Sequence, residues 1–276
     1  MSLDDRLAVL DAELSAAPGV LVAFSGGVDS GVVLAAAVRA LGPDRVVAAT
    51  AVSPSLPAAE RAAAHAFAVG LGVRHEQPAT DELSRPGYVA NAGDRCAFCK
   101  AELVDVLTPL AAELGIADVV TGTNADDLRA GFRPGIRAAA ERGAWAPLAR
   151  AGMTKDDVRA AARRWELPLA DKPAAACLAS RIAYGVPVSR ERLARVEAAE
   201  AALRTALAGA GLPVRDLRVR DMGEGVAKVE VDAALVPAVG PELLAAVTGF
   251  DRVELDPRGF RSGAMNELLP GPVRYR

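Results

Sequence analysis

The residues best placed to do chemistry begin with a string rich in glycine and serine, Ser25-Gly26-Gly27-Val28-Asp29-Ser30. Glycines let a backbone approach phosphate closely, and successive N–H groups at the start of a helix form an anion site. Ser25 and Ser30 add hydroxyl donors, and the Asp29 carboxylate is a suitable ligand for Mg²⁺. No Gly-Lys-Ser/Thr follows, so this is not a Walker P-loop. The string predicts a nucleotide-phosphate site, and the alternative is a glycine-rich turn without a ligand.

A second polar string, Gly122-Thr123-Asn124-Ala125-Asp126-Asp127, follows a buried apolar run. Open parallel sheets bind ligands at the carboxyl ends of their strands. Gly122, Thr123 and Asn124 are therefore predicted to contact the nucleotide, and Asp127 to help hold Mg²⁺. The alternative is an Asx turn, in which these side chains only satisfy their own backbone.

Three cysteines, Cys96, Cys99 and Cys177, are too few for a disulfide framework. Lys172 and Arg181 flank Cys177 in sequence, and nearby cations favour the reactive thiolate. An isolated cysteine is also often a small buried hydrophobe, and the sequence context leaves both interpretations open.

The two histidines, His65 and His75, have no evident partner in the sequence. We predict that both are structural, and a zinc site of mixed ligands would be hard to assemble from so few.

The elements that must position these residues alternate through the first two thirds of the chain. Short continuous apolar runs are typical of strands buried on both faces of a parallel sheet. We expect strands at 19–24, 46–52 and 118–122, and helices at 30–40, 57–70, 100–115 and 154–165. Thr154 and Asp157 suggest a capping box at the start of the last helix. The alternation predicts an α/β fold with a Rossmann-like parallel sheet and helices on both faces.

After about residue 184 the pattern changes to that of a smaller α+β unit. We expect helices at 189–207 and 242–247, and strands at 217–220, 227–231 and 252–255. The turn Gly223-Glu224-Gly225 predicts a hairpin between the first two of these strands. Two domains are therefore expected, residues 1–185 and residues 186–276.

Composition narrows the functional class. The 276 residues are 51% apolar and 24% charged, as in proteins with a substantial core, and the formal net charge is −3. This charge argues against a nucleic-acid partner, since tRNA thiolation would need a basic surface. No apolar run reaches the roughly 18 residues that span a membrane, and the charged N-terminus lacks a signal-peptide pattern. We expect a cytoplasmic protein without nucleic-acid or membrane partners.

The first string resembles the PP-loop signature of ATP pyrophosphatases, which cleave ATP between its α- and β-phosphates. Further motifs are Arg95-Cys96-Ala97-Phe98-Cys99-Lys100, Arg133-Pro134-Gly135, Asp171-Lys172-Pro173 with Cys177 to Gly185, Leu217 to Arg220, and Gly259 to Gly263. In this combination and order the chain resembles the LarE family. Members of that family are ATP-dependent sacrificial sulfur transferases that make the nickel-pincer nucleotide cofactor of lactate racemase. The resemblance extends over nearly the whole chain.

The resemblance implies a PP-loop ATP pyrophosphatase domain at 1–185 and a substrate-binding or oligomerisation domain at 186–276. ATP would adenylylate one carboxylate of a pyridinium-3,5-biscarboxylic acid mononucleotide, and the Cys177 thiolate would attack it to form a thioester. Cleavage of the Cβ–S bond would leave sulfur on the product and dehydroalanine on a protein that reacts once. ATP and Mg²⁺ would be required, and a homo-oligomer is expected.

The resemblance also implies roles for individual residues. The ATP-binding residues would be Ser25, Gly26, Gly27, Asp29, Ser30, Gly122, Thr123 and Asn124. The residues that bind the substrate phosphate would be Ser180, Arg181, Arg218 and Arg220, since guanidinium groups bind phosphate bidentately. The metal ligands would be Asp29, Asp127, Glu200 and Asp232.

Three other functions stay open at this point. Cys96, Cys99 and Cys177 could hold a [4Fe–4S] cluster that carries the sulfur and spares the protein. An ATP-dependent amide-forming PP-loop synthetase would need a source of ammonia, and no segment of the sequence suggests one. An ATP-sensing module would bind nucleotide without releasing pyrophosphate.

Overall fold

The computed structural model describes residues 1–129, 134–173 and 176–269, so Arg133 lies outside the described residues. The chain forms two compact units. Unit 1 contains residues 1–82 and 96–175, and unit 2 contains residues 83–95 and 176–276. A short early segment thus joins the C-terminal unit, while the domain boundary expected at residue 185 stays a prediction.

Unit 1 is built on a parallel four-stranded sheet in the order β3-β2-β1-β4. The strands are β1 (Val20–Ala23), β2 (Val46–Ala49), β3 (Arg74–Glu76) and β4 (Asp118–Thr121). All three pairings are parallel, with Val20 opposite Val46 on one side and Asp118 on the other. The expected parallel sheet is confirmed, and β3 is the strand that the sequence pattern did not predict.

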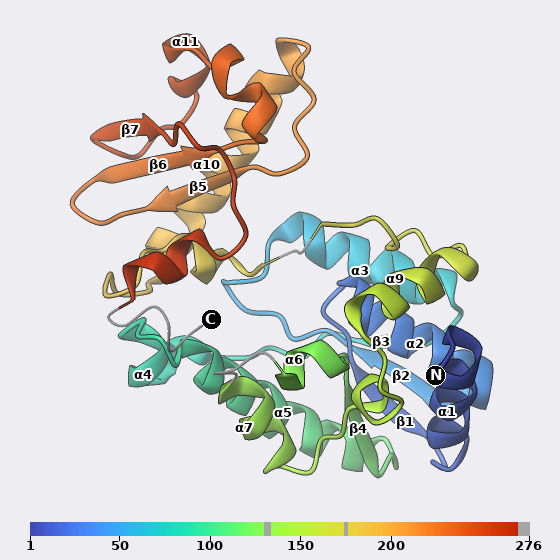
Figure 1. Cartoon of the computed structure of the whole chain (residues 1–276). Coiled ribbons are helices and arrows are strands. Elements are labelled where there is room, and N and C mark those ends of the chain that lie inside the picture. The colour runs from blue at the N-terminus through green and yellow to red at the C-terminus, as the bar shows by residue number, and fades with distance from the viewer. Residues whose placement is uncertain (130–133, 174–175, 270–276) are drawn as a thin grey trace. The chain divides into compact units, whose positions relative to one another are not determined.

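Helices cover both faces of this sheet (Figure 1). Val20 and Val22 point to the face covered by α1 (Leu3–Ser15), α2 (Val28–Leu41), α3 (Ala58–Gly70) and α9 (Lys155–Arg164). Leu21 and Ala23 point to the other face, which packs against α5 (Arg95–Glu113) and α7 (Pro134–Ala140). The other short elements of unit 1 are η1 (Pro43–Arg45), α6 (Ala125–Arg129) and α8 (Pro147–Arg150), and η2 (Glu82–Ser84) spans the point in the chain where unit 2 begins. Burial on both faces explains why β1 and β2 are continuously apolar.

Helix boundaries follow local capping chemistry. Thr154 and Asp157 form the expected capping box at α9, in which each side chain accepts the other residue's backbone N–H. The helix expected at 100–115 instead begins at Arg95, so Cys96 and Cys99 lie in its first turns.

In the described ranges, none of the helices is both long enough and apolar enough to cross a bilayer.

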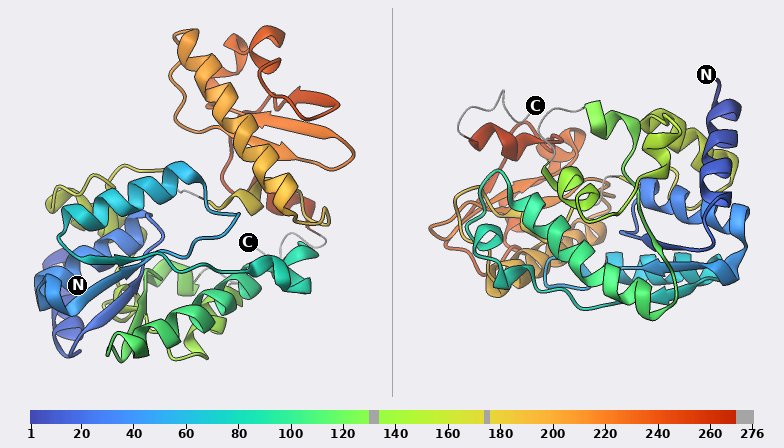
Figure 2. Two further views of the ribbon diagram at one scale, coloured as in Figure 1. Left: turned by 180° about the vertical axis from the view of Figure 1, so that it is seen from behind. Right: turned by 90° about the horizontal axis from the view of Figure 1, so that it is seen from below.

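Unit 2 contains a three-stranded sheet in the order β5-β6-β7, with the strands β5 (Arg218–Asp221), β6 (Val226–Glu230) and β7 (Arg252–Leu255). The predicted hairpin of β5 and β6 is antiparallel, while β7 pairs with β6 in parallel. Helix α10 (Arg190–Gly209) lies across one face, as the left view of Figure 2 shows. The smaller elements are α4 (Pro86–Val89), η3 (Leu178–Arg181), η4 (Ala233–Ala238), α11 (Pro241–Leu244) and η5 (Ala264–Leu268).

The β5-β6 sheet separates apolar from polar side chains. Val219 and Val229 face α10 and pack with Leu203. Because side chains alternate along a strand, Arg218 and Arg220 share the opposite face. Both arginines are nevertheless buried.

Candidate functional site

The glycine- and serine-rich string forms a tight loop between β1 and α2. Gly26 has a φ of 74°, a left-handed conformation that favours glycine, and Gly27 is the N-cap of α2. Gly27 has no side chain to cap the helix, so it leaves the first N–H groups of α2 available as donors. The Ser30 hydroxyl lies 3.1 Å from that of Ser25 and accepts the Ser25 N–H at 3.2 Å. This arrangement is suited to binding phosphate oxygens.

Two lysines that are distant in sequence reach this loop. Lys155, the first residue of α9, forms an ion pair with Asp29. Lys172 Nζ donates to the Gly26 carbonyl at 2.9 Å and pairs with Glu60 at 2.6 Å. Each ammonium group is balanced by a carboxylate, Asp29 or Glu60, so the two lysines fix the loop by ion pairs and a hydrogen bond. The sequence pattern assigned neither lysine to the loop.

The second polar string follows β4 and begins α6. The Asn124 amide donates to Asp29 Oδ1 at 3.0 Å, while its oxygen accepts the N–H groups of Asp126 and Asp127. Asp127 Oδ2 in turn accepts the Asn124 N–H at 3.2 Å. The Asx geometry is thus present, and it also ties the string to the loop. The nucleotide-binding roles of Gly122, Thr123 and Asn124 stay predictions.

Gly122 approaches the loop more closely than a larger residue could. A Cβ atom on Gly122 would lie 2.6 Å from the Ser30 nitrogen and 3.0 Å from the Asp29 carbonyl carbon. The end of β4 therefore packs directly on the first turn of α2, which explains the glycine at this position.

His65 and His75, for which the sequence showed no evident partner, contact each other. Their Nδ1 atoms lie 3.1 Å apart, and His75 Nε2 lies 2.8 Å from the Thr50 hydroxyl. That hydroxyl donates to the Phe24 carbonyl at 2.7 Å, so it must accept from a protonated His75 Nε2. In a neutral His75 the Nδ1 atom is then an acceptor, so its 3.1 Å contact needs a proton on His65 Nδ1. Gln77 Nε2, which can only donate, lies 3.5 Å from the same His65 nitrogen and makes the weaker contact. Burial and the neighbouring His65 lower the pKa of His75, opposed by Glu76, so the neutral form of His75 is favoured.

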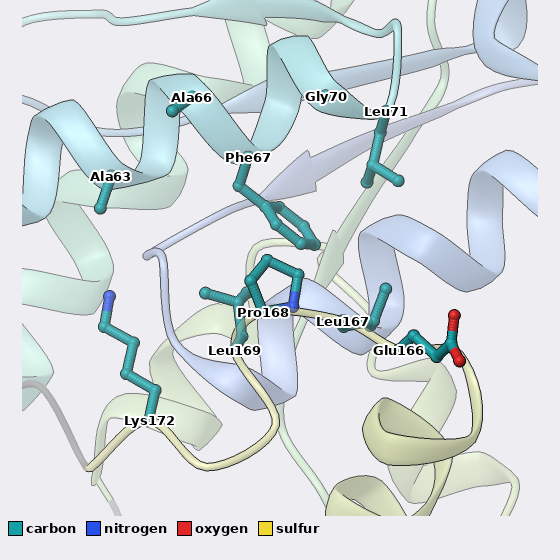
Figure 3. Close-up of a pocket in the computed structure, with 10 residues that line it drawn as sticks. All are labelled: Ala63, Ala66, Phe67, Gly70, Leu71, Glu166, Leu167, Pro168, Leu169 and Lys172. Carbon is teal, nitrogen blue, oxygen red and sulfur yellow. The ribbon is translucent and has the colours of Figure 1, made fainter.

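An apolar pocket of about 610 Å³ lies between α3 and the chain after α9. Figure 3 shows Phe67 of α3 and Leu71, the residue after this helix, facing Leu167, Pro168 and Leu169. Lys172 lies at one end, where its ammonium group contacts the loop. The pocket thus borders the loop in unit 1.

In unit 2, Cys177 is the N-cap residue of η3, and its side chain is partly buried. The Cys177 carbonyl accepts hydrogen bonds from the Ser180 N–H at 3.0 Å, the Ser180 hydroxyl at 2.7 Å and Arg181 Nη1 at 3.1 Å. The backbone of this turn is therefore fixed by its own polar groups.

Three buried guanidinium groups gather beside this turn. Arg181 pairs with Glu200 at 2.9 Å, and Arg220 pairs with Glu230 at 2.8 Å while donating to the Ser180 carbonyl at 3.0 Å. Arg218 lies 5.0 Å above the ring of Phe260. Burial first, then the charges of Arg181 and Arg220, lower the pKa of Arg218 to about 10 despite Glu200. Such mutual repulsion would be relieved by a bound anion.

The predicted metal ligands have partners within the protein. Both Glu200 oxygens bind Arg181, and one also accepts the Val219 N–H at 3.1 Å. The Asp232 carboxylate accepts the N–H groups of Arg215 and Asp216. Within the described ranges, no three His, Cys, Asp or Glu side chains group closely enough to hold a metal ion. The metal-binding roles of Asp29, Asp127, Glu200 and Asp232 stay predictions.

Comparison with known proteins identifies the family. A family model described as NAD synthase matches residues 7–85, which include the loop. The chain is 42% identical over 257 residues to the uncharacterized protein slr1717 of Synechocystis sp., covering 90% of this chain and 92% of that protein. It is 34% identical over 275 residues to the pyridinium-3,5-bisthiocarboxylic acid mononucleotide synthase of Lactiplantibacillus plantarum, covering 97% and 96%. The chain belongs to the LarE family.

LarE membership confirms the resemblance carried by the sequence motifs, and the NAD synthase match agrees with the Rossmann-like parallel sheet around the loop. The family relationship covers both compact units, because the Lactiplantibacillus synthase aligns with nearly the whole chain.

Proposed function

We propose that this LarE family protein transfers sulfur from Cys177 to a pyridinium-3,5-biscarboxylic acid mononucleotide in an ATP-dependent reaction. The gathering of Arg181, Arg218 and Arg220 beside the Cys177 turn carries the proposal. A nucleotide phosphate bound by these guanidinium groups would bring the pyridinium carboxylate close to the thiol.

In the first step the substrate carboxylate attacks the α-phosphorus of ATP, forming an acyl adenylate and releasing pyrophosphate. The N–H groups at the start of α2, with the hydroxyls of Ser25 and Ser30, stabilise the charge on the leaving pyrophosphate. Asp29 supplies a carboxylate on the loop and would hold the Mg²⁺ that accompanies ATP. The magnesium ion would neutralise part of the charge on the ATP phosphates.

In the second step the Cys177 thiolate attacks the activated carbonyl carbon, and AMP leaves with the electron pair of the broken C–O bond. Removal of the Cys177 Cα proton then breaks the Cβ–S bond. Sulfur leaves on the product as a thiocarboxylate, and dehydroalanine remains in the chain. The reaction is redox-neutral, and each chain reacts once, so two chains are spent on a bisthiocarboxylic product.

An intact-mass experiment tests this proposal. Purified protein is incubated with ATP, Mg²⁺ and the pyridinium nucleotide, and pyrophosphate is measured in parallel. We expect loss of the elements of H₂S, located at Cys177 by peptide mass spectrometry, with about one pyrophosphate per modified chain. A sulfurated product from a chain of unchanged mass would overturn the proposal.

Matched cysteine variants distinguish sulfur transfer from Cys177 from the alternative in which the cysteines hold an iron–sulfur cluster. Cys177→Ser is expected to release pyrophosphate and form no thiocarboxylate, whereas Cys96→Ser/Cys99→Ser is expected to react as the wild type does. A cluster mechanism predicts instead that the double variant fails and that the active wild type absorbs visible light. An amide-forming synthetase would give an amide product with ammonia, independently of Cys177.

A further inference from the structure

Asn91 is a buried residue that connects two distant segments of unit 2. It follows α4 with a φ of 53°, a left-handed conformation that asparagine tolerates better than most residues. Its amide nitrogen donates to the carbonyls of Ala183 and Val186, both at 2.8 Å, and more weakly to that of Ile182 at 3.3 Å. The Asn91 carbonyl accepts the Gly185 N–H at 3.1 Å. One side chain thus fixes the backbone that follows η3.

Arg95 extends the same network toward Cys177. Its guanidinium is buried and donates through Nη1 to the Asn91 side-chain oxygen and, at 2.9 Å, to the Ala179 carbonyl. It also lies 5.5 Å above the ring of Tyr184. Ala179 is only two residues after Cys177 and belongs to the same helical turn.

The network meets the turn that carries the thiol. Residues 179, 182, 183 and 186 are held by Asn91 and Arg95, while the Cys177 carbonyl is held by Ser180 and Arg181. These bonds from Asn91 and Arg95 end on backbone carbonyls of η3 and of the residues that follow it. Their effect on Cys177 is therefore transmitted through the backbone of the turn.

We propose that Asn91 and Arg95 are positioning residues for Cys177. They set the conformation of the η3 turn so that the thiolate meets the activated carbonyl carbon, an inference that rests on the proposed sulfur transfer. A nucleophile must approach in the correct geometry, and a displacement of about 1 Å can slow a reaction about 100-fold. Segment 83–95 thereby supports the chemistry of a cysteine more than eighty residues further along the chain.

The test uses Asn91→Asp and Arg95→Lys in the full chain. Aspartate accepts the left-handed conformation and the Arg95 hydrogen bond but cannot donate to the three carbonyls. Lysine retains the charge of Arg95 but lacks the planar fork. With ATP, Mg²⁺ and the pyridinium nucleotide, we expect first-turnover pyrophosphate release within about twofold of wild type and dehydroalanine formation slowed about tenfold or more. Thr205→Ala, on the exposed side of α10, should alter neither rate.

A second readout does not depend on the reaction. The rate at which iodoacetamide alkylates Cys177, followed by peptide mass spectrometry, should differ from wild type by about threefold or more in both variants and be unchanged in Thr205→Ala. If Asn91→Asp does not fold, Asn91→Gly keeps the left-handed backbone and removes the same donors.

Two outcomes would overturn the inference. One is a folded variant in which alkylation and dehydroalanine formation both match wild type. The other is a loss of pyrophosphate release and dehydroalanine in the same proportion, which would indicate general destabilisation. If the wild type itself forms no dehydroalanine, the proposed function fails, and the alkylation rates still decide whether Asn91 and Arg95 set the Cys177 turn.

Discussion

Lys155 and Asp29 form an ion pair at the first turn of α2, where the proposed pyrophosphate would leave. Lys155 neutralises a carboxylate that would otherwise repel ATP phosphates. We expect Lys155→Met to raise the Kd for ATP about tenfold or more, because the unpaired Asp29 carboxylate would repel the phosphates and about 1.4 kcal/mol of repulsion is a factor of ten. Titration calorimetry with a non-hydrolysable ATP analogue measures this effect.

Lys228→Met in unit 2 is the matched control, because it removes the same charge from a lysine 4.0 Å from Asp256. An unchanged Kd in Lys155→Met would show that the ion pair plays no part in holding ATP.

Some residues of the candidate site could be predicted from the sequence, and others could not. The loop was predictable because glycines and serines cluster within six positions. Lys155 and Lys172 were not, since their loop partners lie 126 and 146 residues away. The pairing of His65 with His75 depends on how α3 packs beside β3, which no spacing encodes.

At the scale of elements, the contact of β4 with α2 depends on Gly122. A methyl group at this position would overlap the backbone of Ser30, which cannot move without shifting the start of α2. We expect Gly122→Ala to destabilise the protein by about 1–3 kcal/mol through overpacking and to weaken ATP binding strongly. Denaturant unfolding and ATP titration measure the two effects.

Gly70→Ala provides the comparison, because a Cβ atom there meets nothing within 4 Å. It should leave ATP binding unchanged and preserve or slightly increase stability, since alanine favours helix. Equal behaviour of the two variants would contradict the role of close packing at Gly122.

The types of the secondary-structure elements were predicted better than their boundaries. The buried strands β1, β2 and β4 could be identified because parallel strands covered on both faces are continuously apolar. The strand β3 was missed because Arg74, His75 and Glu76 are polar and lie at the edge of the sheet. The start of α5 was missed because its first residues were interpreted as a cysteine motif rather than as helix.

For the whole molecule, the His65–His75 pair predicts a pH dependence of stability. Burial lowers the pKa of His75 from 6.5. Between the two pKa values the unfolded chain therefore binds a proton at His75 that the folded chain does not bind. The stabilisation is present above about pH 6.5 and is lost as the pH falls toward the lower folded pKa. Protonation would also place hydrogens on both facing Nδ1 atoms.

We expect the free energy of unfolding to fall between about pH 7.5 and pH 5.5, with a shallower slope in His75→Gln. Denaturant unfolding at each pH measures it. Asp221 and Asp256 do not interfere, because their pKa values are lowered from 3.8 by hydrogen bonds and ion pairs, against the effect of burial. Identical slopes in the two proteins would refute the assignment to His75.

Unit 2 is assembled from residues 83–95 and a segment that begins at 176. During synthesis the early segment leaves the ribosome about eighty residues before its partners, so Asn91 has no backbone carbonyls to bind until that later segment emerges. Closing so long a loop costs entropy, which delays native contacts in unit 2 relative to the local ones of α10. A fragment starting at residue 176 would also lack Asn91 and Arg95, leaving the carbonyls of Ala179 and Ala183 without these donors. Truncation at that boundary should therefore yield an incompletely folded C-terminal half, whereas a fusion that restores residues 83–95 should not.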